Sequence, residues 1–295
     1  MKNLWRWLTV IVAVVVSTSF ATACHAQKVK QSTNYVSSTT PTIFFHGWGS
    51  SYRAEQQMTH YAKDHGVTNT IVRANVAKNG KVTWQGKIKR GTKNPIIEVN
   101  LANNKSTKLG EKSISDGYSK SSNYVFDVLT ATQKKFGFTK VNIVAHSMGN
   151  LQVYYYLRNH GADPKLPQIQ KIVDIAGHWN GLEAEKGANK VTLNPKTGEP
   201  SRQLPGYAGL ITLRNTFPQQ IKVLNIYGNL EDGSNSDGTV PTVSSKSLRW
   251  LLNNRAKSYQ ELEIKGKMGQ HSKLHENKQV DRALVKFIWE KWKIL

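Results

Sequence analysis

Cysteine is nearly absent from this chain of 295 residues. The single cysteine, Cys24, lies near the amino terminus, and residues 25–295 contain none. This excludes a disulfide framework, a cysteine-based metal site and a cysteine nucleophile from that part of the chain. Nucleophilic chemistry there has to come from a different side chain, and the residues call for no metal and no organic cofactor.

A continuous apolar run of the length that a membrane-spanning helix needs, about 18 residues, is also lacking. The longest such run, Leu8–Val16, follows two basic residues and precedes the small-residue stretch STSFATACHA. This order is typical of a secretory signal peptide. We therefore expect residues 1–26 to be a signal peptide or an N-terminal anchor, followed by a flexible spacer over 27–40. Lipidation at Cys24 and ordinary cleavage nearby are both compatible with the pattern.

Acidic residues are few: 19 Asp and Glu stand against 41 Lys and Arg, which gives a formal charge of +22. Such an excess usually predicts a nucleic acid partner. Export argues against that partner, and the basic residues are dispersed along the chain. We expect instead an extracellular or cell-surface protein with a salt-sensitive attraction to anionic wall polymer or a membrane surface, or a solvated basic surface without a partner.

The chain does contain an alternation of short apolar runs with helical patterns. Strands are expected within 40–47, 68–76, 96–101, 141–144, 171–181 and 221–229, and helices within 55–66, 123–138, 150–160 and 280–295. This alternation predicts an α/β fold, with a mostly parallel central sheet flanked by helices, over residues 41–295. The Asn79-Gly80 pair predicts a β-hairpin excursion beside that sheet.

The segment 182–220 is too long for a plain connection and is rich in proline and glycine. We expect it to form a cap-like insertion over the carboxyl edge of the sheet. Apolar residues in and near it are candidates to line a substrate pocket, and Trp179, Tyr207 and Leu210 are chosen for that role.

The stretch VNIVAHSMGN, residues 141–150, places Ser147 between a β-branched run and a helical pattern. Small residues, Ala145 and Gly149, lie two positions before and two after the serine. A sharp strand-to-helix turn requires this pattern, and it exposes the serine hydroxyl. The turn also directs the backbone N–H of Met148 toward the same point. Ser147 is therefore a candidate nucleophile.

A serine nucleophile needs an imidazole base that a carboxylate holds in one tautomer. The loop NLEDGSNSDGTVP offers Glu231, Asp232 and Asp237, and Asp237 is favoured because Val-Pro follows it closely, as in many hydrolase acid loops. The loop GQHSKLHEN offers His271 and His275. His271 is favoured because it lies on the loop that precedes the final helix.

An oxyanion formed at the serine needs two N–H donors. Met148 supplies one of them. The segment HGWG directly follows the first expected strand, so the backbone N–H of Trp48 is the second candidate. We expect His46 to orient this loop through hydrogen bonds and not to act as a base.

Together these motifs resemble the α/β-hydrolase lipases and esterases, and more narrowly the cell-surface α/β hydrolases of Gram-positive bacteria. The resemblance covers most of residues 41–295 and rests on TIFFHGWGSS, NPIIEVNL, VNIVAHSMGN, DIAGHWNG, NIYGN with SDGTVPTVSS, and HSKLHEN. It implies a Ser147, Asp237 and His271 triad, in the serine, acid, histidine order of that fold. Ala145 departs from the glycine usual at its position.

The resemblance implies an exported serine hydrolase that cleaves carboxylic esters, with a small molecule or a lipid as substrate. Two alternatives stay open at this point. One is an acyltransferase or amidase acting on cell-envelope substrates, because the triad serves those reactions equally well. The other is a catalytically silent basic protein that binds anionic wall polymer.

Overall fold

The structure is a computed structural model that describes residues 32–107 and 114–291. The expected signal peptide or anchor over 1–26, with Cys24, lies outside the described residues. Within them, eight strands form one sheet in the order β3-β2-β4-β1-β5-β6-β7-β8. The strands are β1 (Thr42–Phe45), β2 (Ile71–Val76), β3 (Val82–Gln85), β4 (Ile96–Leu101), β5 (Lys140–His146), β6 (Gln168–Ile175), β7 (Lys222–Asn229) and β8 (Ser258–Lys265).

Every pair of neighbouring strands is parallel except β2 and β3, which form an antiparallel hairpin at one edge. The mostly parallel sheet predicted from the sequence is therefore confirmed. The hairpin turns at Gly80, whose φ of 84° is readily adopted by glycine.

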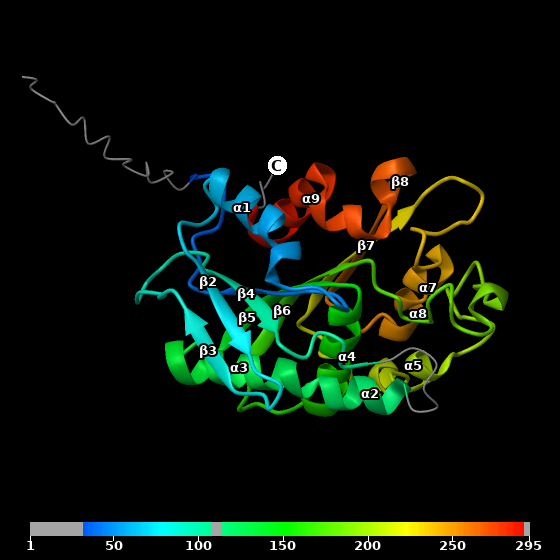
Figure 1. Cartoon of the computed structure of the whole chain (residues 1–295), viewed down its shortest axis with the longest axis horizontal. Coiled ribbons are helices and arrows are strands. Elements are labelled where there is room, and N and C mark those ends of the chain that lie inside the picture. The colour runs from blue at the N-terminus through cyan, green and yellow to red at the C-terminus, as the bar shows by residue number, and fades with distance from the viewer. Residues whose placement is uncertain (1–31, 108–113, 292–295) are drawn as a thin grey trace, which may run out of the picture.

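Helices cover both faces of the sheet (Figure 1). One face carries α1 (Gln56–Asp64) and α9 (Lys278–Trp289). The other carries α2 (Ile114–Ser121), α3 (Asn123–Phe136), α4 (Met148–His160), α5 (Pro205–Ala208), α6 (Leu213–Thr216) and α8 (Leu248–Leu252), and α7 (Thr242–Lys246) precedes α8. Short 3-10 turns complete the described elements: η1 (Tyr52–Ala54), η2 (Ala188–Lys190), η3 (Gly266–Gly269) and η4 (His271–Glu276).

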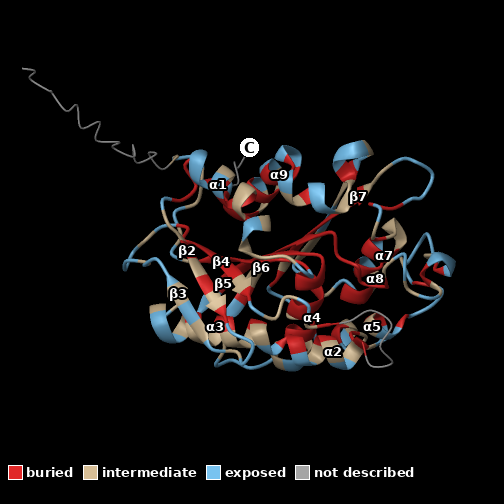
Figure 2. Ribbon diagram, viewed as in Figure 1, coloured by how far each residue is buried: buried red, intermediate tan, exposed pale blue. Residues whose placement is uncertain are grey.

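The sheet is buried on both faces because successive side chains of a strand point to opposite sides. In β1, Ile43 and Phe45 enter the core beneath α2, α3 and α4, whereas Phe44 enters the core beneath α1 and α9. Figure 2 shows the central strands as a continuous buried layer. This arrangement explains why these strands read as uninterrupted apolar runs in the sequence.

Four elements, β8, α2, α7 and α8, are not predicted by the sequence patterns. Strand β8 lies at the edge of the sheet and carries Gln260, Glu261 and Glu263, of which the first two are exposed. An edge strand with a solvated face needs no continuous apolar run, so its sequence resembles a loop.

The cap-like insertion over 182–220 contains η2, α5, α6 and an isolated bridge between Leu193 and Pro200. Its second half packs against the helical layer: the Tyr155 hydroxyl donates to the carbonyl oxygen of Gly206 at 2.8 Å. Its role as a cap stays a prediction.

Part of the segment expected to be a flexible spacer lies against the domain. Tyr35 forms an antiparallel bridge with Glu290, and the Val36 N–H donates to the carbonyl oxygen of Trp289 at 2.7 Å. The Asn94 N–H donates to the carbonyl oxygen of Ser38 at 2.6 Å. Between Tyr35 and Ser38 the chain is thus held by backbone hydrogen bonds that its polar composition did not predict.

Candidate active site

The turn at Ser147 joins β5 to α4 and has a strained backbone. Ser147 has φ 50° and ψ −120°, a conformation that residues with a side chain rarely adopt. Its N–H donates to the carbonyl oxygen of Ile175 at 2.9 Å, which ties the turn to the end of β6. A Cβ at Gly149 would lie 2.7 Å from the carbonyl oxygen of Phe45, so only glycine fits there. The small residue at position 149 is therefore required by the crowded backbone of the turn.

Ser147, His271 and Asp237 form one hydrogen-bonded row. The His271 Nε2 lies 3.0 Å from the Ser147 Oγ, and the His271 Nδ1 lies 2.8 Å from the Asp237 Oδ2. With the Nδ1 proton donated to the carboxylate, Nε2 is left to accept the serine proton. The side chain of His271 is 12% exposed and that of Asp237 is 1% exposed.

Asp237 is held in place by the loop that carries it. Its Oδ1 accepts the N–H groups of Thr239 at 2.9 Å and Val240 at 2.7 Å, which leaves Oδ2 for His271. The other two acids point elsewhere: Glu231 pairs with Lys265 at 3.2 Å, and Asp232 accepts the Ser234 N–H at 3.0 Å.

Two glycines bring the acid loop and the histidine loop together. A Cβ at Gly228, in β7, would lie 1.8 Å from the carbonyl oxygen of Gly269 and 2.9 Å from the Cβ of Asp237. The His271 N–H then donates to the carbonyl oxygen of Asp237 at 2.9 Å. The sequence analysis did not predict a role for Gly228 or Gly269, although their positions just before the two loops are a signal that could have indicated one.

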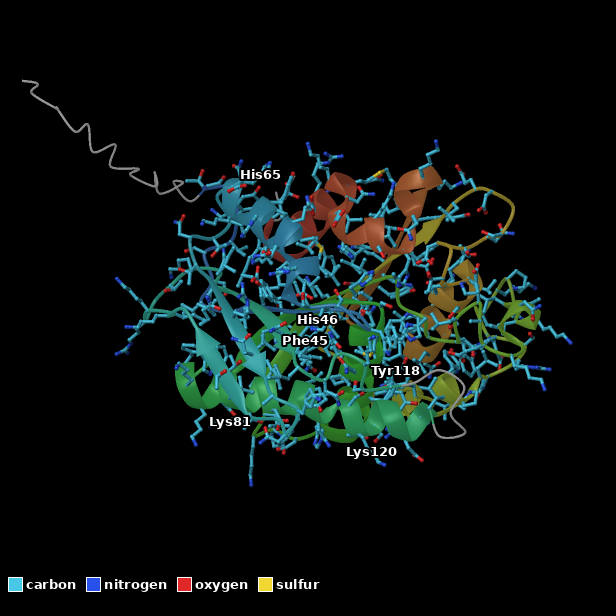
Figure 3. All side chains as sticks on the ribbon, viewed as in Figure 1. Phe45, His46, His65, Lys81, Tyr118 and Lys120 are labelled. Atoms are coloured by element: carbon cyan, nitrogen blue, oxygen red, sulfur yellow. The ribbon has the colours of Figure 1, made fainter. Side chains whose placement is uncertain are left out.

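The loop after β1 lies directly against the serine. A Cβ at Gly47 would lie 3.0 Å from the Ser147 Cβ. His46 is fully buried: its Nδ1 donates to the Gly47 carbonyl oxygen at 2.8 Å, and its Nε2 accepts the Leu101 N–H at 3.1 Å. Burial lowers the pKa of His46, which favours this neutral form. Figure 3 shows His46 at the centre of the molecule, where it links the loop to the end of β4.

Two backbone N–H groups belong to the segments next to the serine. Met148 is the first residue of α4, and the first N–H groups of a helix have no acceptor within it. Trp48 directly follows Gly47, so its N–H belongs to the loop that touches Ser147. The Trp48 indole donates to the Thr107 carbonyl oxygen at 3.0 Å, and its side chain remains 53% exposed.

Three further histidines surround His271. The His146 Nε2 donates to the carbonyl oxygen of His271 at 3.1 Å, and its ring centroid lies 4.9 Å from those of both His271 and His275. The Nε2 of His178 is hydrogen bonded to the Tyr118 hydroxyl at 2.7 Å. The sequence suggested only plain explanations for His146 and His178, because the contacts that group them join distant parts of the chain.

The pKa values of these surrounding imidazoles are lowered, which favours their neutral forms. Burial, with smaller contributions from the neighbouring histidines, holds the pKa of His146 well below its ordinary value. Burial, followed by the effect of His271, lowers the pKa of His178 to about 3, and burial also lowers that of His275. A second imidazolium beside His271 would repel the charge that forms there during proton transfer, so neutral neighbours suit a base at this position.

The three residues predicted to bind substrate lie in the core. Trp179, Tyr207 and Leu210 are each 0% exposed. The Trp179 ring packs 4.3 Å from that of Tyr154, and the Tyr207 hydroxyl donates to the Ser247 carbonyl oxygen at 2.9 Å. They present no surface to a ligand in this structure, because these apolar residues in and near the insertion pack in the core instead of lining an opening.

No group of three or more His, Cys, Asp or Glu side chains in residues 32–107 and 114–291 is arranged to hold a metal ion. Nor does a helix in that part of the chain have both the length and the apolar character needed to cross a membrane.

Comparison with solved structures shows the same fold in two bacterial proteins. The product of gene lin2722 from Listeria innocua is 26% identical, with a TM-score of 0.76, and the match covers 87% of this chain and 96% of that one. A proposed cell surface hydrolase of Lactobacillus plantarum WCFS1 is 20% identical, with a TM-score of 0.65, and the match covers 84% and 89%. A comparison with curated proteins finds no match.

A family model described as "Alpha/beta hydrolase of unknown function (DUF915)" matches residues 29–291. This span includes the strained serine turn, the acid loop and the histidine loop. The resemblance that the sequence motifs indicated is confirmed, and the chain belongs to this family of α/β hydrolases.

Proposed function

We propose that this α/β hydrolase cleaves carboxylic esters through an acyl-enzyme formed on Ser147. The observation that carries the proposal is the row of hydrogen bonds from the Ser147 Oγ through His271 to Asp237. A serine hydroxyl is a weak nucleophile unless a base removes its proton during attack. The 3.0 Å contact with Nε2 puts such a base within reach.

In the proposed reaction, the Ser147 Oγ attacks the ester carbonyl carbon while its proton moves to the Nε2 of His271. Asp237 stays ionised and stabilises the imidazolium. The N–H groups of Trp48 and Met148 stabilise the negative charge on the former carbonyl oxygen. His271 then returns the proton to the leaving alcohol, and water hydrolyses the acyl-enzyme by the same sequence of proton transfers.

The exposed ring of Trp48 supports a substrate with an apolar portion. This side chain is 53% exposed, and its backbone belongs to the loop that touches the serine. Lys105 lies over the ring, with its Nζ 5.0 Å from the centroid, so one face of the ring has a cationic neighbour. We propose an ester of a small molecule or a lipid whose acyl or alkyl group contacts this ring.

We propose further that the protein acts outside the cytoplasm. The N-terminal sequence has the order of a signal peptide, and the similar Lactobacillus plantarum protein is described as a proposed cell surface hydrolase. Fractionation of cells that produce the full chain would test this placement. Recovery of the protein in the cytoplasm alone would contradict it.

A fluorophosphonate probe and a series of p-nitrophenyl esters test the activity. We expect the probe to label the wild-type protein at Ser147 and the Ser147→Ala variant not at all, with turnover lowered by about four orders of magnitude or more. Ser37→Ala is the matched control, because it removes an exposed serine hydroxyl from the segment before β1.

Two outcomes would contradict the proposal. Absence of labelling in folded wild-type protein would favour a silent surface protein. Labelling without ester hydrolysis, together with acyl transfer to an added alcohol or amine, would favour a transferase.

A further inference from the structure

A groove of about 660 Å³ lies at the amino ends of β6, β7 and β8, beside the last turns of α9. The serine turn follows the carboxyl end of β5, and the acid loop follows the carboxyl end of β7, so the groove lies at the opposite edge of this parallel sheet from the candidate active site. Nothing in the proposed ester chemistry uses it.

Five lysines line this groove: Lys171, Lys222, Lys257, Lys286 and Lys291. They come from separate elements, and Lys257, Lys286 and Lys291 are exposed. Two carboxylates, Glu261 and Glu290, are the acidic groups of the lining. The groove therefore has an excess of positive charge, which favours an anionic ligand.

The groove also has an apolar lining. Leu224 is buried, and Leu262, Ala283 and Phe287 are half-buried. The apolar side chains thus lie deeper than the three exposed lysines. A fully hydrated anion would gain nothing from such a surface, whereas an anion attached to a hydrocarbon part would use both kinds of contact.

Lys171 joins the groove to the end of α9. Its Nζ donates to the carbonyl oxygens of Phe287 at 3.0 Å and Ile288 at 2.7 Å, in the last turn of the helix. Burial, and after it the nearby charge of Lys222, lowers the pKa of Lys171 to about 8. An anion bound here would oppose both effects and favour the charged form of the lysine.

The same corner of the molecule holds the beginning of the described chain. Glu290 forms the bridge with Tyr35, and the Lys291 Nζ donates to the carbonyl oxygen of Thr33 at 2.7 Å. Residues 1–31, which include the apolar run Leu8–Val16, join the domain next to this pair. In Figure 1 the first described residues lie beside α1 and α9.

From these observations we propose that the lysine groove docks on an anionic membrane surface, with the phosphate of a phospholipid headgroup between the lysines and the upper acyl carbons against Phe287 and Leu262. The apolar lining and the adjacent attachment of residues 1–31 favour lipid over a hydrophilic phosphate polymer. The docking needs no bond to form or break and is independent of the proposed esterase activity.

The test measures binding of the full chain to vesicles of phosphatidylglycerol and phosphatidylcholine, and to vesicles of phosphatidylcholine alone, at several salt concentrations. We expect the double variant Lys257→Glu with Lys286→Glu to bind the anionic vesicles at least about tenfold more weakly than the wild type. We also expect this difference to shrink at high salt.

The control carries the same change of charge elsewhere. Lys81 and Lys120 are exposed and lie at the lower edge of Figure 3, across the molecule from α9. The double variant Lys81→Glu with Lys120→Glu should weaken binding by less than about twofold. A third variant, Phe287→Ser, tests the apolar contact and should weaken binding while leaving its salt dependence unchanged. Unfolding midpoints of all variants show that each is folded.

Three results would overturn the inference. Equal losses in the two double variants would mean that net charge alone attracts the protein. Equal binding of wild type and groove variant to both kinds of vesicle would mean that the groove contributes nothing. Groove-dependent binding to soluble inorganic polyphosphate, without groove-dependent binding to vesicles, would assign the site to a phosphate polymer.

Discussion

The two ends of the parallel strands β5 to β8 use their polar residues in opposite ways. At the carboxyl end, Ser147 and the histidines near it are largely removed from water and are fixed by hydrogen bonds to backbone and side chains. At the amino end, lysines from separate elements surround an open groove. Interactions between desolvated, oriented groups are strong and depend little on salt concentration. Interactions between solvated charges are weak and are screened by dissolved ions.

Substitutions at the two ends should therefore have different effects. At the carboxyl end, changing a single group should abolish most activity, because Ser147, His271 and Asp237 form one chain of hydrogen bonds. At the amino end, effects should be modest, additive and sensitive to ionic strength.

The largest effect is expected from Asp237→Asn. The amide in place of the carboxylate cannot stabilise the imidazolium of His271 and favours the wrong tautomer, so kcat on a p-nitrophenyl ester should fall by about three to four orders of magnitude. Asp232→Asn is the control: it changes an exposed carboxylate of the same loop and should leave kcat within about twofold of the wild type. If Asp237→Asn retained a tenth of the activity, another acid would have to serve His271.

A backbone substitution at the carboxyl end comes next. Gly228→Ala forces a methyl group to within 1.8 Å of the Gly269 carbonyl oxygen, so the histidine loop has to move. We expect the free energy of unfolding to fall by about 3 kcal/mol, with loss of most activity. Gly206→Ala should change little, because the nearest atom to its Cβ is 4.0 Å away. Chemical denaturation measures both, and equal stabilities would contradict the close packing of β7 against η3.

The neutral histidines predict a loss of stability in mild acid. The pKa of His178 is about 3 in the folded protein, against about 6.5 in the unfolded chain, so the unfolded state binds more protons between these values. Stability therefore rises with pH across that window, and His178 alone should remove about 2 kcal/mol between pH 7 and pH 5. His178→Gln should flatten this part of the profile of unfolding free energy against pH, with His160→Gln, on the end of α4, as the control. Parallel profiles for wild type and His178→Gln would contradict this prediction, because they would show that His178 binds a proton over the same pH range in the folded protein as in the unfolded chain.

The smallest effect belongs to the amino end. Lys171→Met removes two hydrogen bonds to the last carbonyl oxygens of α9 and should lower the free energy of unfolding by about 1 kcal/mol. Turnover of a soluble ester should not change, because the groove and the serine lie at opposite ends of the strands. A large loss of activity in this variant would mean that the two ends are coupled.

The sequence predicted best what is dictated by local backbone geometry. A Cβ at Gly149 would collide with the backbone of Phe45, and the small residues that such a turn requires make the motif around Ser147 recognisable from sequence. The choice of Asp237 over Asp232 also used local information, the Val-Pro that follows, and the structure places that carboxylate beside His271.

What the sequence could not predict depends on contacts between distant segments. Apolar residues have the same identity in a core and in a pocket wall, so the buried positions of Trp179, Tyr207 and Leu210 could not be foreseen. His275 is close to His271 in sequence, whereas His146 at the end of β5 and His178 just after β6 are brought beside His271 only by the fold. The groove could not be predicted from the sequence either, because its lysines lie far apart in the chain, from position 171 to position 291.

The length of β7 determines how far the lysine groove lies from the candidate active site. Its eight residues, Lys222–Asn229, begin at the groove and end at the acid loop, and a strand rises about 3.3 Å per residue, so the two ends are about 25 Å apart. With the lysine groove docked on a bilayer and β7 upright, the serine would lie about 25 Å from the headgroups, so a lipid substrate would have to leave that bilayer to reach it. Its natural ester would then be found in the layer above, on a diffusing molecule or on a neighbouring structure.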